Sequence, residues 1–213
     1  MDSGTDWLHN DLGNGSDNYS NIWHNTAEND WTNPTNPSTG NGIDDDNNGF
    51  IDDWIGWDFA NQDNNTITSN PHGTQVSGIV SAKTNNSLGI SGTAGGNNDK
   101  GILLMPLMVG ESAPDGSVID DAIEYAVNNG AKVIQMSLSV IHSNAIDSAI
   151  LLAENANVSI VCAAGNGYSS NVNYPASNSY VIAVGSTNQF DHKSDFSNYG
   201  QDLFIAAPGE DIY

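Results

Sequence analysis

The chain has 213 residues, a length that fits one sizeable domain, and 38% of them are hydrophobic, which is enough for a buried core. Lys and Arg total 4 against 26 Asp and Glu, so the formal charge of −22 excludes nucleic acid and anionic membrane surfaces as partners. No apolar run reaches the ~20 residues of a membrane-spanning helix, and the residues after Met1 are not expected to form a signal peptide. The single cysteine, Cys162, lies in an apolar run and is expected to be a buried thiol.

Residues 1–70 are rich in Asn, Asp, Gly and Thr and predict a long loop region that needs tethering. Within it, an aspartate-rich stretch has the pattern of a loop that wraps Ca²⁺, with side-chain oxygens at alternate positions, a glycine sixth and a backbone carbonyl seventh. Positions one, three, five, six, seven and nine are Asp44, Asp46, Asn48, Gly49, Phe50 and Asp52. The twelfth is Ile55 in place of glutamate, so Asp53 or Asp58 would have to complete the shell. An acidic turn without an ion is the alternative, but repulsion among its carboxylates favours calcium.

The segment 70–80 predicts a helix that begins close to His72. Apolar residues recur there at helical spacing, at Val76, Ile79 and Val80. Small Ser77 and Gly78 lie between them, so we expect a closely packed, buried helix. A histidine at the start of such a helix is a candidate general base, and an ordinary surface histidine is the alternative.

Beyond residue 70, apolar runs alternate with helical stretches. Strands are predicted over 102–109, 133–138, 158–164, 180–185 and 203–206, and helices over 118–129 and 145–155. Ser117 with Asp120 predicts a capping box for the first of these helices, and Gly130 predicts its end. The alternation predicts an α/β fold of three layers, a mostly parallel central sheet with helices on both faces, whose ligands bind at the carboxyl ends of the strands.

Four segments in this order carry a family resemblance. They are Asp2-Ser3-Gly4 with His9-Asn10-Asp11-Leu12, then His72-Gly73-Thr74, then Ser137-Leu138-Ser139 at a strand end, then Ala163-Ala164-Gly165-Asn166. In these motifs the chain closely resembles the subtilisin-like serine peptidases. The resemblance implies one partial peptidase domain over residues 1–213, in which 13–69 is a loop-rich acidic insertion and 70–213 is the regular α/β core. It also implies a secreted protein that acts on protein or peptide substrates.

The resemblance assigns a role to each matching residue. Asp2 would be the triad carboxylate, His72 the general base and later the general acid, and Asn166 the side-chain donor of the oxyanion hole. Substrate backbone would bind as an added strand. The residues that would line it are Asp115, Gly116, Ser117, Ser137, Leu138, Ser139, Ala164 and Gly165. Family members usually have glycine in place of Ser139, so this serine would narrow the specificity pocket.

A second calcium site follows from the same resemblance. Its ligands would be the side chains of Asp11 and Asn86 together with backbone carbonyl oxygens. Those carbonyls belong to Thr84, Leu88 and Ile90.

The family's nucleophile lies in a Gly-Thr-Ser-Met-Ala segment after Ala-Pro-Gly, which is residues 207–209 here, and no serine of this chain stands in that motif. The strand that leads into Asp2 is also missing, so we expect a fold incomplete at both ends, whose exposed core favours self-association. One interpretation is part of a subtilisin-like endopeptidase, inactive until the serine segment is supplied in cis or in trans. The alternatives are a rearranged hydrolase of esters, lactones or peptides that uses His72 with another nucleophile or water, and a non-catalytic calcium-binding module.

Overall fold

The computed structural model describes residues 1–12, 21–28, 39–97 and 101–212. It divides into two compact units, Met1–Ala113 and Pro114–Tyr213, and each unit is described by itself. Residues 70–113, which the sequence groups with the regular core, belong to the first unit. The organisation as a single domain stays a prediction.

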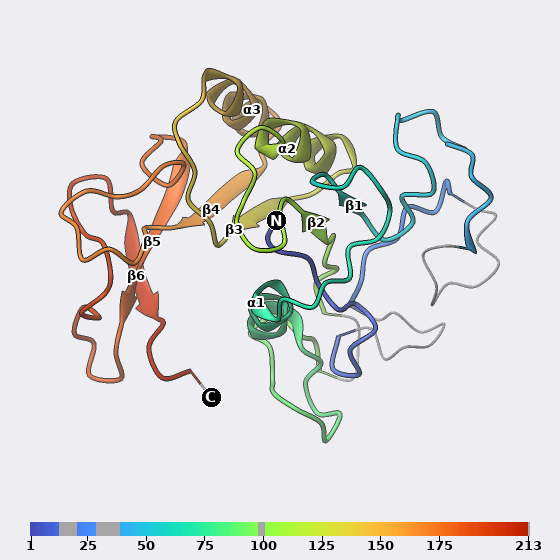
Figure 1. Cartoon of the computed structure of the whole chain (residues 1–213). Coiled ribbons are helices and arrows are strands. Elements are labelled where there is room, and N and C mark those ends of the chain that lie inside the picture. Colours follow the sequence, from blue (N-terminus) through green and yellow to red (C-terminus); the bar gives the residue numbers. More distant parts are fainter. Residues whose placement is uncertain (13–20, 29–38, 98–100, 213) are drawn as a thin grey trace. The chain divides into compact units, whose positions relative to one another are not determined.

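The first unit contains the helix α1 (His72–Ser81) and a parallel pair of short strands, β1 (Trp57–Asp58) and β2 (Leu107–Met108) (Figure 1). Asp2 also pairs with β2, since its N–H donates to the Leu107 carbonyl at 3.0 Å and its own carbonyl accepts from Val109 at 3.0 Å. This pairing fixes the backbone of Asp2 at the edge of a small parallel sheet.

The predicted strand over 102–109 forms only at its end, as β2. Pro106 has no N–H to donate, so the ladder cannot continue through it. Leu104 instead forms an isolated parallel bridge with Ile22, which comes from the loop region. The strand β1 in that region was not predicted, because two residues carry no periodicity.

The loop region is tethered by its own apolar residues. A core cluster of the first unit consists of Trp7, Leu12, Ile22 and Ile55, each no more than 3% exposed. Two of these four residues come from the predicted insertion 13–69, and β1 of the same stretch is buried. The described part of the insertion is therefore an integral part of the first unit.

The prediction that α1 is a buried helix is wrong for the unit as described. Only two residues of α1 are buried, and Ile79 is 44% exposed. Small and polar side chains contribute to the contacts of the helix with the unit. Thr5 Oγ1 and Ser77 Oγ are hydrogen-bonded at 3.1 Å, and the N–H of Asp6 donates to Thr74 Oγ1 at 2.9 Å.

The second unit is built on a parallel sheet of four strands in the order β3-β4-β5-β6 (Figure 1). Its strands are β3 (Val133–Met136), β4 (Ser159–Ala163), β5 (Val181–Thr187) and β6 (Ile205–Pro208), and its helices are α2 (Ile119–Asn128) and α3 (Asn144–Asn155). The helix α3 connects β3 to β4, and it packs against both α2 and β4. The predicted mostly parallel α/β architecture is confirmed. None of the described helices has the length and apolar character needed to cross a membrane.

The ends of the two helices follow local rules, with one correction. Ser143 caps α3, since its hydroxyl accepts the N–H of Ala145 at 3.3 Å. Gly130, at φ +79°, follows the end of α2 as predicted. The predicted capping box at the start of α2 is wrong. The Ser117 hydroxyl donates to Asp115 Oδ1 at 2.6 Å, and α2 begins at Ile119 without a side-chain cap.

Candidate active site and cation sites

Asp2 and His72 are in direct contact. His72 Nδ1 lies 2.7 Å from Asp2 Oδ1, which also accepts the N–H of Ser3 at 2.7 Å. A carboxylate only accepts hydrogen bonds, so the proton of a neutral imidazole is on Nδ1 and the lone pair is on Nε2. The His72 side chain is 53% exposed and that of Asp2 only 9%, so a buried carboxylate orients an accessible ring. This is the geometry of an oriented general base.

The close approach of two backbone segments makes this pair possible. The N–H of Gly73 donates to Ser3 Oγ at 3.2 Å, and a Cβ on Gly73 would lie 2.0 Å from the carbonyl oxygen of Gly4. Gly4 has φ +100°, a conformation that favours glycine. The Gly residues of the two motifs therefore bring the start of α1 against the segment that carries Asp2.

The chain that leads into His72 is held by Glu111, a residue that no motif indicates. Asn70 Oδ1 accepts the N–H of His72 at 3.0 Å, while Asn70 Nδ2 donates to the Glu111 carbonyl at 2.6 Å. The hydroxyls of Thr68 and Ser69 both donate to the Glu111 carboxylate at 2.9 Å. These hydrogen bonds hold the pKa of Glu111 below its ordinary value.

Asn166, the predicted oxyanion donor, is an exposed residue in the turn that follows β4. Buried Asn198, only 1% exposed, shapes this turn. Its Oδ1 accepts the N–H groups of Gly167 at 2.9 Å and Ser169 at 3.0 Å, and its Nδ2 donates to the Ala164 carbonyl at 3.2 Å. Sequence reasoning missed Asn198 because its partners lie 29 to 34 residues away in the chain.

In the second unit, hydrogen bonds of Asn173 link the turn before Asn166 to the chain that follows β3. Ser139 is exposed, and its hydroxyl accepts from Asn173 Nδ2 at 3.2 Å. The N–H of Asn173 donates to the Ala164 carbonyl at 2.9 Å. Gly165 has φ +108°, and a Cβ there would lie 2.5 Å from the Asn173 side chain. The predicted substrate-contact residues Ser139, Ala164 and Gly165 are thus brought close to one another.

The two predicted substrate edges also lie side by side, since a Cβ on Gly116 would be 3.5 Å from the Cβ of Val140. On the first edge, hydrogen bonds from the Ser117 hydroxyl and N–H lower the pKa of Asp115. On the second edge, Leu138 is 8% exposed. Its neighbour Ser137 accepts a hydrogen bond from Gln135. The structure therefore places these edges in one unit, and the Asp2–His72 pair in the other.

Comparison with known proteins decides the family. The model of the subtilase family matches residues 1–213. The chain belongs to the subtilase family. Thermitase of Thermoactinomyces vulgaris is 41% identical over 159 residues, which are 74% of this subtilase and 56% of thermitase. The cell wall-associated protease of Bacillus subtilis (strain 168) is 39% identical over 160 residues, 74% of this chain and 17% of that protein.

Solved structures agree with the family. A cold adapted subtilisin-like serine proteinase has a TM-score of 0.62 and 30% identity, over 74% of this subtilase and 55% of that chain. The prenylagaramide maturation protease PagA has a TM-score of 0.58 and 30% identity, over 66% and 52% of the two chains. The predicted subtilisin-like fold is confirmed, and this subtilase spans about half the length of these two structures.

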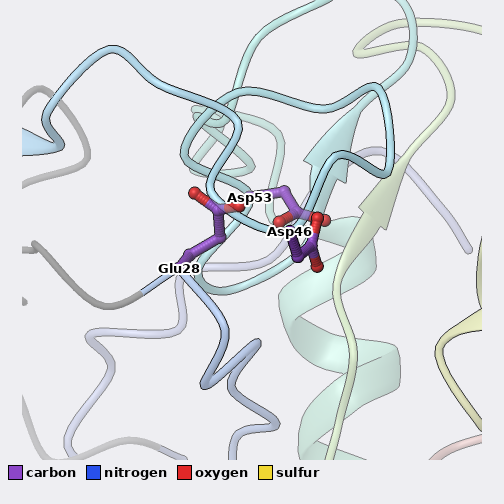
Figure 2. Close-up of side chains that lie close together, drawn as sticks. All are labelled: Glu28, Asp46 and Asp53. Carbon is purple, nitrogen blue, oxygen red and sulfur yellow. The ribbon is translucent and has the colours of Figure 1, made fainter.

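Three carboxylates of this subtilase gather beside the predicted calcium loop (Figure 2). One ligand atom each of Glu28, Asp46 and Asp53 lies within 4.8 Å of the others. Asp46 is a predicted loop ligand, and Asp53 is one of the two residues expected to complete the shell. The other, Asp58, instead accepts hydrogen bonds within the turn that follows it. Glu28 was not predicted, because it lies outside the loop and 18 positions before Asp46.

The remaining side chains of the calcium loop shape its turns. Asp44 accepts the N–H of Asn48 at 3.0 Å, and Asn48 Oδ1 accepts the N–H of Phe50 at 2.8 Å. The Asp52 carboxylate accepts the N–H of Gly42 at 2.9 Å. The assignment of Asp44, Asn48, Phe50 and Asp52 as calcium ligands stays a prediction.

Glu28 lies in an electrostatically unfavourable environment. Only 2% of the residue is exposed, and Asp53 is fully buried. Burial, followed by the negative charge of Asp53, raises the pKa of Glu28 to about 7, although backbone N–H groups of Asp45 and Asp46 act in the opposite direction. Without a counter-ion, a carboxylate is therefore poorly stabilised at this position.

The second predicted calcium loop closes around Asp11, which is 4% exposed. Asp11 Oδ1 accepts from Asn86 Nδ2 at 2.6 Å, and its Oδ2 accepts the N–H of Ile90 at 2.9 Å. A Cβ on Gly89, at φ +42°, would lie 2.3 Å from Asp11 Oδ2, so the glycine leaves room for the carboxylate. The carbonyls of the predicted set belong to the same loop, at Thr84, Leu88 and Ile90. An oxygen-rich loop around a buried carboxylate suits Ca²⁺.

Proposed function

We propose that this subtilase is a serine endopeptidase domain that hydrolyses peptide bonds in protein or peptide substrates. The observation that carries the proposal is the 2.7 Å contact between His72 Nδ1 and Asp2 Oδ1. It leaves Nε2 as the basic nitrogen on an accessible ring. His72 would take the proton of a nucleophilic hydroxyl through Nε2 and later deliver it to the leaving amine, while Asp2 stabilises the imidazolium.

Asn166 is proposed as the oxyanion donor. Its side chain is exposed and forms no hydrogen bond with the described residues, so its amide N–H is available to a substrate oxygen. The turn around it is held by buried Asn198, which limits the reorganisation needed when charge develops. Loss of one such donor costs about 10²–10³-fold in turnover in this family.

The nucleophile is proposed to come from a Gly-Thr-Ser-Met-Ala segment supplied in cis or in trans. No serine of the 213 residues stands in this motif, and the chain covers 56% of thermitase. We therefore expect the 213-residue polypeptide alone to be inactive. Removing a triad nucleophile leaves at most residual catalysis.

Structural calcium and secretion complete the proposal. Ca²⁺ would be held by the loop around Asp11 and by the loop over residues 44–53, where it offsets the repulsion of the carboxylates. When bound, the ion would contribute folding free energy and take no part in the chemistry. A secreted location is supported by the relative described as cell wall-associated.

The proposed function is tested with a fluorophosphonate reagent that labels activated serines. We expect no labelling of the 213-residue protein, and labelling of the same chain extended by a segment that carries Gly-Thr-Ser-Met-Ala. His72→Ala should abolish the labelling. His142→Ala is the matched control, because His142 is also exposed and lies 2.8 Å from a carboxylate, that of Asp147. Hydrolysis by the 213-residue protein alone, lost in His72→Ala, would favour the rearranged hydrolase instead.

A further inference from the structure

The carboxylates of Glu28, Asp46 and Asp53 form a cluster of negative charge, in which Glu28 and Asp53 are buried and Asp46 is not. Glu28 is 2% exposed and Asp53 is fully buried. Figure 2 shows the Glu28 carboxylate turned toward the side chains of Asp53 and Asp46. Carboxylates whose oxygens lie within 4.8 Å of one another repel, and the repulsion is strongest between the two buried ones, Glu28 and Asp53.

The chain offers no cationic side chain from this region to balance the charge. The first 82 residues contain neither lysine nor arginine. Two neutral side-chain amides donate to the cluster. Asn25 Nδ2 donates to Asp46 at 3.0 Å and to Asp53 at 2.6 Å, and Asn48 Nδ2 donates to the same two residues at 3.2 and 3.0 Å. Neutral donors satisfy hydrogen bonds, but they do not compensate three negative charges.

One oxygen of the cluster has no donor within the described part of the chain. Glu28 Oε1 accepts the N–H of Asp45 at 3.1 Å, whereas Glu28 Oε2 is buried and has no hydrogen-bond partner among the described residues. A buried carboxylate oxygen without a partner is costly, and native proteins rarely keep one. A bound cation would supply the missing partner and the missing charge together.

The donor set indicates which cation would bind. The cluster contains oxygen ligands only, which hard cations such as Ca²⁺ and Mg²⁺ prefer over zinc or copper. Two oxygens on one Ca²⁺ ion, each at 2.3–2.6 Å, lie at most about 5 Å apart, and the oxygens of the cluster meet this limit. An irregular loop with several carboxylates suits the flexible coordination of Ca²⁺ better than the strict octahedron of Mg²⁺.

We propose that Glu28, Asp46 and Asp53 together bind a divalent cation, with Ca²⁺ preferred over Mg²⁺, and that Glu28 replaces the glutamate missing from the end of the 44–53 loop. The site would then join the chain around residue 28 to the loop that follows it. The assignment rests on the calcium component of the proposed function and is independent of the peptidase chemistry. The loop around Asp11 is a separate site.

The test is calcium binding to the 213-residue protein after removal of metal with a chelator. Calorimetric titration with Ca²⁺ should show two classes of site. Glu28→Gln, which keeps the shape and removes the charge, should weaken one class about tenfold or more. Asp11→Asn should weaken the other class instead. Asp45→Asn is the matched control in the same loop, because Asp45 accepts a hydrogen bond from Asn41 and does not belong to the cluster.

Thermal unfolding gives a second readout, because the effect of Glu28→Gln on the melting temperature should reverse between chelator and excess Ca²⁺. In chelator, Glu28→Gln should raise the melting temperature above that of the parent protein, because it removes a buried uncompensated charge. In excess Ca²⁺ it should lower the melting temperature relative to the parent. If Glu28→Gln fails to fold, Asp46→Asn should weaken the same class of site.

Calcium affinity in Glu28→Gln equal to that of the parent would overturn the assignment. Binding of Mg²⁺ as tight as that of Ca²⁺ would overturn the preference. Because these measurements do not use hydrolysis, inactivity of the chain completed with its serine segment would count against the peptidase proposal alone.

Discussion

The imidazole Nδ1 of His72 lies 2.7 Å from Oδ1 of Asp2, although 70 positions separate the two residues in the chain. The contact depends on the backbone as much as on the side chains. Gly73 follows His72 and Gly4 follows Asp2 by two positions, and a Cβ on Gly73 would lie 2.0 Å from the Gly4 carbonyl oxygen. The general base is therefore oriented by the close approach of the Gly4 backbone to the start of α1, which only glycine at position 73 permits.

Gly73→Ala should separate the pair and destabilise the protein by about 1–3 kcal/mol, because the new methyl group has to push the Gly4 backbone away. Gly78→Ala in the same helix is the control. Its Cβ would meet only Ile90 Cδ1, at 3.4 Å, so the better helix propensity of alanine should stabilise by about 0.5–1 kcal/mol. Urea unfolding of the two variants measures both values. Equal effects of the two substitutions would contradict the close packing at Gly73.

Asp2→Asn should change the tautomer of His72. The carboxylate accepts from Nδ1–H, whereas an asparagine amide can donate to Nδ1 and leave the proton on Nε2. Nitrogen-15 NMR of the imidazole should show protonation at Nδ1 in the parent and at Nε2 in the variant. In a chain completed with the serine segment, the same variant should lose about 10⁴-fold in kcat. An unchanged tautomer would mean that Asp2 does not orient the ring.

Asn198→Ala should destabilise the protein by about 1–3 kcal/mol, since it removes the buried partner of three backbone groups around the Asn166 turn. Asn171→Ala is the matched control, because Asn171 is an exposed residue of the same loop. Its substitution should change the free energy of unfolding by less than about 0.5 kcal/mol. Chemical denaturation checks both. Comparable losses in the two variants would show that Asn198 has no special role in the turn.

The Cys162 thiol should not react in the native protein near neutral pH. Burial raises the pKa of Cys162 to about 12, so the reactive thiolate is rare until the pH approaches that value. The unfolded chain loses this proton near its ordinary pKa of 9.0, so the contribution of Cys162 to stability falls as the pH rises from about 9 toward 12. Ellman's reagent at about pH 8 should find no thiol in the native protein and one after unfolding. Rapid labelling of the native protein would contradict the burial of β4.

Much of the second unit could be predicted, because each of its elements carries a strong local signal. The apolar runs that form β4 and β5 and the amphipathic pattern of α2 appear in the sequence within a residue or two of their observed bounds. Asp2 and His72 could be predicted because each stands in a short motif. The parallel arrangement that supports these elements follows from their alternation along the chain.

Other features depend on contacts that no local pattern encodes. Glu28 and Asn198 act on residues 17 to 34 positions away through single side chains, and neither belongs to a motif. The strand predicted over 102–109 is interrupted at Pro106, where the ladder lacks a donor. The capping box failed because the Ser117 hydroxyl has a closer acceptor in Asp115. At Ser117 a specific partner therefore prevailed over the local capping rule.

The most direct test of the Asp2–His72 pair is hydrolysis of a peptide substrate by the chain completed with its Gly-Thr-Ser-Met-Ala segment. His72→Ala should lower kcat by about 10⁴-fold or more, while His142→Ala, which removes another histidine paired with a carboxylate, should leave kcat within about twofold of the parent. Parent-like kcat in His72→Ala would contradict the assignment of His72 as the general base.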